Sequence, residues 1–114
     1  MRVAVVCPRG RVTKHRVLRA IKNSGFYFTE VVTWPRRFLV LELKGYFNRH
    51  NRKVKAFPTK WSTFGRDAPL ERDKKIVGYC DAFIAIYDGD APDVRNFLAM
   101  AIASGKAVHV EMIG

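Results

Sequence analysis

Residues 34–61 mix positively charged side chains with aromatic rings, and this combination could bind a flexible polyanion. Single-stranded nucleic acids are held in this way, with bases stacked on rings and phosphates contacted by cations, without reading of the base sequence. The competing interpretation is that the rings pack in the core. We expect Phe47 to be in the core and Trp34 to be exposed. The cations Arg36 and Arg37 should face solvent.

Other residues that could ligate or react give weaker patterns. Asp88, Asp90 and Asp93 lie close together and could bind a divalent cation, but a turn followed by a helix N-terminus explains them better. The three histidines are isolated in the sequence, so we expect no metal site. Cys7 could be a nucleophile, but Arg9 is too near for a phosphatase loop, and a packed apolar role suits this thiol better. We therefore expect no catalytic residue and no cofactor.

Short apolar runs alternate along the chain with segments whose apolar residues recur at helical spacing. These patterns predict the strands and helices that must position the candidate site residues. We expect strands at residues 3–6, 29–33, 54–57, 82–87 and 108–112, and helices at 12–23, 34–50, 69–79 and 92–104. Apolar strands that alternate with helices are typical of a parallel sheet covered on both faces. We predict an α/β fold over residues 1–114: a single-domain Rossmann-like three-layer sandwich with a five-stranded parallel sheet.

Right-handed crossovers and a strand order of 3-2-1-4-5 would place the first two helices on one face and the last two on the other. The net charge of +11 is unevenly distributed, because residues 1–60 hold fifteen basic side chains against two acidic ones. Such a basic face attracts nucleic acid or an acidic protein surface, whereas a solubilising surface without a partner is the alternative. The residues expected to form this face are Arg16, Arg19, Lys22, Arg36, Arg37, Lys44, Arg49, Arg52 and Trp34.

The composition favours an intracellular domain with a well-formed hydrophobic core. Apolar residues make up 48% of the chain, and no apolar stretch is long enough for a membrane helix or a signal peptide. Cys7 and Cys80 lie far apart without the spacing of a redox or metal motif, so reduced thiols are expected. We expect a cytoplasmic protein that makes no membrane contact.

The later residues carry a recognisable pattern. Residues 55–61, 64–66 and 81–89, with Arg72, resemble the YspA-like, cpYpsA-related branch of the SLOG superfamily, which also contains the LOG phosphoribohydrolases. The resemblance extends over nearly the whole chain, and Trp61 matches a family residue that we expect to be structural. It implies a Rossmann-like fold with a pocket for nucleotides or nucleotide-derived molecules at the carboxyl ends of the strands.

The departures from the family pattern fall in the ligand loops. Residues 33–40 replace the family's Gly-rich phosphate loop, with Trp34 and Pro35 in place of glycines. A phosphate could not approach that backbone, because Pro35 has no N–H and Trp34 fills space. Of the Gly-Ser-Arg that follows the family's first strand only Arg9 remains, and Asp93 replaces the glycine of a Gly-Thr pair. We therefore expect a degenerate ligand site.

The sequence thus favours a non-enzymatic SLOG-like binding or regulatory protein that acts through its basic helical face, such as an accessory or inhibitory protein of a phage or mobile element. The alternative is a nucleotide-ligand sensor or nucleotide hydrolase with a remodelled pocket. Its candidate anion-binding residues are Arg9, Arg66, Arg72 and Arg95. Trp34 in the old phosphate site would favour the first hypothesis, and an open cationic cleft the second.

A third possibility is a homo-oligomer in which the basic face of one copy meets the acidic face of another. Contacts of this kind weaken as salt screens the charges.

Overall fold

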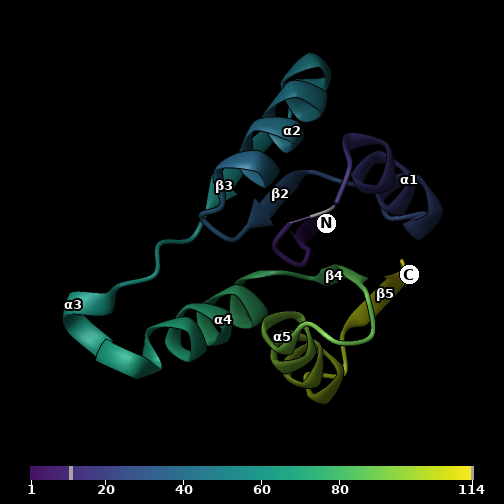
Figure 1. Cartoon of the computed structure of the whole chain (residues 1–114). Coiled ribbons are helices and arrows are strands. Elements are labelled where there is room, and N and C mark those ends of the chain that lie inside the picture. Colours follow the sequence, from purple (N-terminus) through teal and green to yellow (C-terminus); the bar gives the residue numbers. More distant parts are fainter. Residues whose placement is uncertain (11, 114) are drawn as a thin grey trace.

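The computed structural model describes residues 1–10 and 12–113, which fold around one twisted parallel sheet (Figure 1). The strands are β1 (Arg2–Val6), β2 (Glu30–Thr33), β3 (Lys53–Ala56), β4 (Ala82–Tyr87) and β5 (Ala107–Met112). They lie in the order β3-β2-β1-β4-β5 with every neighbouring pair parallel. The predicted fold class and strand order are confirmed.

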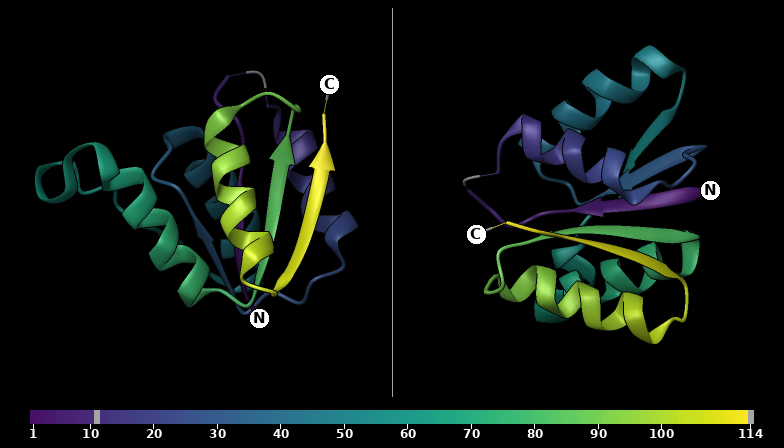
Figure 2. Two further views of the ribbon diagram at one scale, coloured as in Figure 1. Left: turned by 90° about the horizontal axis from the view of Figure 1, so that it is seen from below. Right: turned by 90° about the vertical axis from the view of Figure 1, so that its right-hand side faces the viewer.

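The helices form one layer on each side of the sheet. They are α1 (Lys14–Ser24), α2 (Arg37–Phe47), α3 (Trp61–Phe64), α4 (Ala68–Tyr79) and α5 (Pro92–Ala103), with short 3₁₀ turns at Asn48–His50 and Gly65–Asp67. Alternate strand residues face opposite layers: Val3 and Val5 pack with α1 and α2, whereas Ala4 and Val6 pack with α4 and α5. Figure 2 (right) shows the two layers on opposite faces, as predicted.

Local chemistry sets the ends of these helices. The Thr13 side chain accepts a hydrogen bond from the Arg16 N–H at the start of α1, and Gly25, with φ of 67°, closes the last turn through the Lys22 carbonyl. Prolines occupy the first turns of α4 and α5, where no backbone N–H is needed. No helix in the described part of the chain is long and apolar enough to cross a membrane.

Most boundaries lie within two residues of the predictions, and two segments differ more. The helix expected from residue 34 begins at Arg37, because Arg36 is extended and its guanidinium is anchored to other loops. The segment expected to be a loop around Trp61 contains α3, and Trp61 itself is 59% exposed.

The orientation of α2 can be tested with a matched pair of leucines. Leu43 is fully buried against the sheet, whereas Leu41 is 57% exposed on the same helix. We expect Leu43→Ala to lower the free energy of unfolding by about 2–5 kcal/mol through the cavity it leaves. Leu41→Ala should change it by no more than about 0.5 kcal/mol. Urea unfolding of both variants measures the difference, and similar losses would contradict this orientation of α2.

Candidate functional site

The carboxyl ends of the strands border an open cleft of about 740 Å³. Its walls come from the segments that follow β1 to β4 and from the beginning of α4. All five prolines of the chain line it: Pro8, Pro35, Pro58, Pro69 and Pro92. Because proline has no backbone N–H, these positions offer no main-chain donors to an anion. Side chains must therefore supply any anion contacts in this cleft.

Trp34 lies buried beneath this cleft, with none of its surface exposed. Its ring meets that of Phe97 edge-on at 5.8 Å, in the core between the sheet and the α4–α5 layer. The Arg36 and Arg72 guanidinium carbons lie 4.5 and 4.8 Å from the indole ring. The indole Nε1–H donates to Asp73 Oδ1 at 2.9 Å. The expectation of an exposed Trp34 on the basic helical face is therefore wrong.

Arg36 is also placed differently from the expectation. Its Nη1 donates to the Cys7 carbonyl at 2.6 Å, and its Nη2 forms an ion pair with Asp93 at the start of α5. The side chain is only 19% exposed, so Arg36 faces the strand ends and not the solvent side of α2. The carboxylate of Asp93, expected to repel a phosphate, instead neutralises Arg36 and ties α5 to the segment after β2.

Arg72 and Asp73 form a second ion pair under the cleft. Arg72 Nε donates to Asp73 Oδ1 at 3.0 Å, and its Nη1 donates to the Thr59 hydroxyl at 2.9 Å. Both charged side chains are less than 10% exposed. Burial raises the pKa of the Asp73 carboxyl, against the opposing effects of the Arg72 charge and the hydrogen bonds from Arg72 and Trp34.

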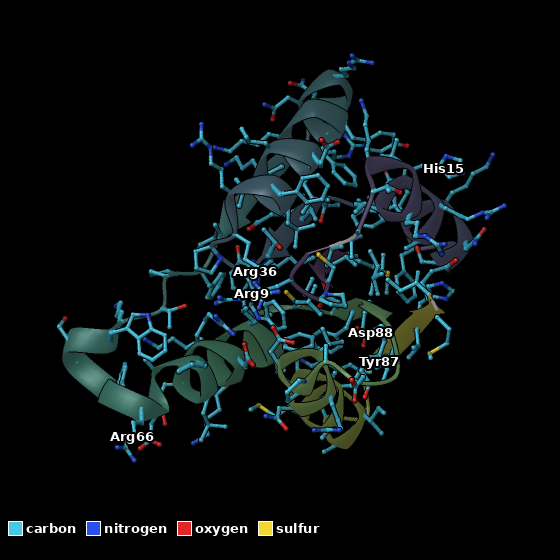
Figure 3. All side chains as sticks on the ribbon, in the orientation of Figure 1. Arg9, His15, Arg36, Arg66, Tyr87 and Asp88 are labelled. Atoms are coloured by element: carbon cyan, nitrogen blue, oxygen red, sulfur yellow. The ribbon has the colours of Figure 1, made fainter. Side chains whose placement is uncertain are left out.

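Arg9 is the one cleft arginine with no hydrogen bond or ion pair to another described residue. Figure 3 shows it beside Arg36 where the strands end. Of the four arginines expected around an anion, Arg9 and Arg72 line the cleft. Arg66 lies on the distant turn after α3 (Figure 3), and Arg95 is exposed on α5 away from the cleft lining.

Seven exposed cations lie on α1, on α2 and on the 3₁₀ turn that follows α2, and we call them the basic layer. Its members are Lys14, Arg16, Arg19, Lys22, Arg37, Lys44 and Arg49. None of them forms an ion pair with a described carboxylate, and Glu42 is the only acidic residue of the two helices. Arg52, expected on this face, is half-buried and its Nε donates to the Phe28 carbonyl at 2.7 Å.

The two thiols are buried and their environment disfavours the thiolate form. Burial raises the pKa of Cys7 to about 11 and that of Cys80 to about 12, so both stay protonated at neutral pH. Cys7 packs in the core as expected. Asp88 closes a turn by accepting from the Asp90 and Ala91 N–H groups at 2.9 and 2.8 Å, as predicted. Among the described side chains no group of three His, Cys, Asp or Glu residues could hold a metal ion.

The arrangement around Trp34 was missed from sequence, although two signals pointed toward it. Arg72 and Asp73 are adjacent oppositely charged residues on a helix that must pack against the sheet. The prolines follow strands or begin helices, so all of them had to gather at one edge of the sheet.

Comparison with protein-family models, with curated proteins and with solved structures finds no match to this chain. Membership of the SLOG superfamily therefore stays a prediction from the sequence motifs.

The pH dependence of stability tests the environment of Asp73. Its folded-state pKa is raised above the ordinary value of 3.8, so the folded protein takes up a proton before the unfolded chain does as the pH falls. Ionised Asp73 therefore lowers the free energy of unfolding at neutral pH, and this effect disappears as the pH falls toward 3.8.

The variant Asp73→Asn has no titrating group at this position and serves as the reference. We expect the free energy of unfolding of wild type, relative to Asp73→Asn, to rise as the pH falls from 7 toward 4. A decrease over this range would show that the Arg72 charge outweighs burial.

Proposed function

We propose that this chain is a non-enzymatic, SLOG-like binding domain of the cytoplasm whose basic layer contacts the phosphates of a nucleic acid. The observation that carries the proposal is that the exposed cations of the basic layer have no carboxylate partner among the described residues. Exposed cations on one surface attract a polyanion and release its counterions on contact, without any dedicated pocket.

Exposed rings near the basic layer support a single-stranded target. Phe38 is 43% exposed beside Arg37, and Tyr27 is 69% exposed just beyond the end of α1. Bases can stack on such rings while neighbouring cations hold the backbone.

The chemistry of the cleft supports a surface function over catalysis. Its proline rim offers few main-chain donors, and the charges of Arg36 and Arg72 are already neutralised by Asp93 and Asp73. A phosphate entering there would have to compete with the carboxylates of Asp93 and Asp73, which also hold the loops together.

The proposal is tested by reversing charge on each of the two basic helices. We expect Arg19→Glu with Arg37→Glu to weaken binding of a short labelled single-stranded DNA or RNA roughly tenfold at low salt. Each lost phosphate contact should also reduce the slope of log affinity against log salt by about 0.7. Fluorescence anisotropy across a salt series measures both quantities.

The matched control places the same charge change on the opposite layer. Lys75→Glu with Arg95→Glu alters two exposed cations of α4 and α5 that form no ion pair with a described carboxylate. This variant should bind nearly as tightly as wild type, and both double variants should melt close to the wild-type temperature. Equal loss in the two variants would show that net charge and not the basic layer drives binding. Failure of wild type to bind any oligonucleotide would redirect the search to an acidic protein partner.

A second candidate function is favoured by Arg9. This arginine has no partner among the described residues and lines the open cleft, so it could receive the anionic group of a nucleotide-derived ligand. Arg72, which also lines the cleft, could add a second contact, although its charge is already partly neutralised.

A thermal-shift panel of mononucleotides and dinucleotides tests this second candidate. A ligand bound in the cleft raises the melting temperature of wild type by mass action, and Arg9→Ala should abolish the shift. Arg95→Ala is the matched control, because Arg95 is an exposed arginine outside the cleft lining and its loss should leave the shift intact. An equal shift in wild type and Arg9→Ala would exclude this site.

A further inference from the structure

The two edges of the sheet differ in how they are protected from pairing. Along β3, Lys53 and Lys55 are exposed, and charged side chains of this kind discourage a second strand from adding to an edge. The opposite edge is β5, with Val110 39% and Met112 60% exposed. Figure 2 (left) shows β5 at the free border of the sheet, beyond β4. A six-residue edge strand with an apolar face and no lysine is a site for strand pairing.

The orientation of the β5 backbone defines which groups are available. The Ile113 N–H donates to the Tyr87 carbonyl at 2.8 Å, so it points toward β4. Because successive residues of a strand direct their backbone groups to alternate sides, the N–H and C=O groups of Val108, Val110 and Met112 point away from the sheet. These three residues present the donors and acceptors of a free edge.

We propose that two copies of this chain pair antiparallel through β5, with the two-fold axis at Val110. Val110 then exchanges both backbone hydrogen bonds with Val110 of the second copy. Val108 does the same with Met112 of the other chain, and the pairing continues one five-stranded sheet into the next. The interface is isologous, so one surface serves both partners.

The side chains of β5 are self-complementary in this register. His109 and Glu111 share one face, where His109 Nε2 lies 2.8 Å from Glu111 Oε1 and Asn23 Nδ2 donates to Glu111 Oε2 at 3.1 Å. With the axis at Val110, His109 of each copy lies opposite Glu111 of the other in a non-hydrogen-bonded pair, where facing side chains are closest. If the two-fold axis lay at Glu111, the Glu111 carboxylates of the two copies would face each other. If it lay at His109, the two His109 rings would face each other, and fewer backbone hydrogen bonds would join the strands.

The apolar face of β5 has matching complementarity. Val108, Val110 and Met112 lie on the α5 side, where Ile102 of α5 is also exposed. In the same register Val110 faces Val110, and Val108 faces Met112 of the second copy. Cross-strand apolar pairs of this kind stabilise the pairing of two strands. The second copy is thus the occupant that satisfies backbone, charge and apolar surface together.

The oligomeric state of the whole chain tests the proposal. We expect light scattering across the micromolar range to give twice the 13.1 kDa mass of one chain. Val110→Lys places two like charges directly opposite each other and should give the monomer. Leu41→Lys, the same kind of change at an exposed site on α2, should remain dimeric. A monomeric wild type, or a Val110→Lys dimer as tight as wild type, would overturn the proposal.

Charge exchange tests the register. The variant His109→Glu places a new carboxylate opposite Glu111 of the other copy. This repulsion should raise the dissociation constant of the dimer roughly tenfold. His109→Glu with Glu111→His restores opposite partners and should recover most of the loss. Sedimentation of the folded variants measures both changes, and a double variant no better than the single one would rule out this register.

Salt separates this dimer from assembly of a basic face on an acidic face. Both copies carry a net charge of +11, so screening relieves their mutual repulsion, and the β5 dimer should persist at about 0.5 M NaCl. Dissociation on raising the salt would favour the charge-driven assembly and contradict pairing through β5.

Discussion

The burial of Trp34 beneath two arginines is the constraint on which the strand ends depend. An indole and two guanidinium groups at the border of the core require counter-charges and hydrogen-bond acceptors, because unpaired buried charge is strongly unfavourable. Asp73 satisfies both the indole and Arg72, and Asp93 satisfies Arg36. Since these carboxylates lie on α4 and α5, the interaction fixes where both helices meet the end of β2. The loops after the strands are therefore held by polar contacts and bordered by proline.

This constraint determines which cations remain available for binding. Arg36 and Arg72, near the strand ends, already have carboxylate or carbonyl partners within the protein. Their hydrogen bonds therefore stabilise the fold and are not free to bind another molecule. The cations of the basic layer have no such partners among the described residues and stay exposed. Arg9 is the exception within the cleft, which is why a ligand there stays the second candidate. The cations that have no partner within the fold are therefore the ones available to bind another molecule.

Sequence reasoning succeeded where the determining pattern is local. Apolar runs and apolar residues at helical spacing were enough to predict the strands and helices, because each follows from neighbouring residues. For a strand order of 3-2-1-4-5, the handedness of the crossovers then predicted the two layers. It failed at Trp34 and Arg36, which were expected to be exposed because basic residues surround them in sequence. Their actual partners are Asp73 and Asp93, 39 and 57 residues further along the chain. No local pattern contains such a contact, and the order of the sheet alone does not specify which side chains meet at its end.

The proposed β5 dimer would also change what the basic layer can do. His109 and Glu111 of both copies lie on the α1 side of the joined sheet, so the two-fold axis runs perpendicular to the sheet and keeps corresponding faces on the same side. Both basic layers would then face one direction, as two linked binding surfaces. A polyanion long enough to reach both gains affinity from the high effective concentration of the second surface. On this view a variant that prevents pairing weakens binding to long strands more than to short ones, although it removes no cation, so the edge strand and the basic layer would act together.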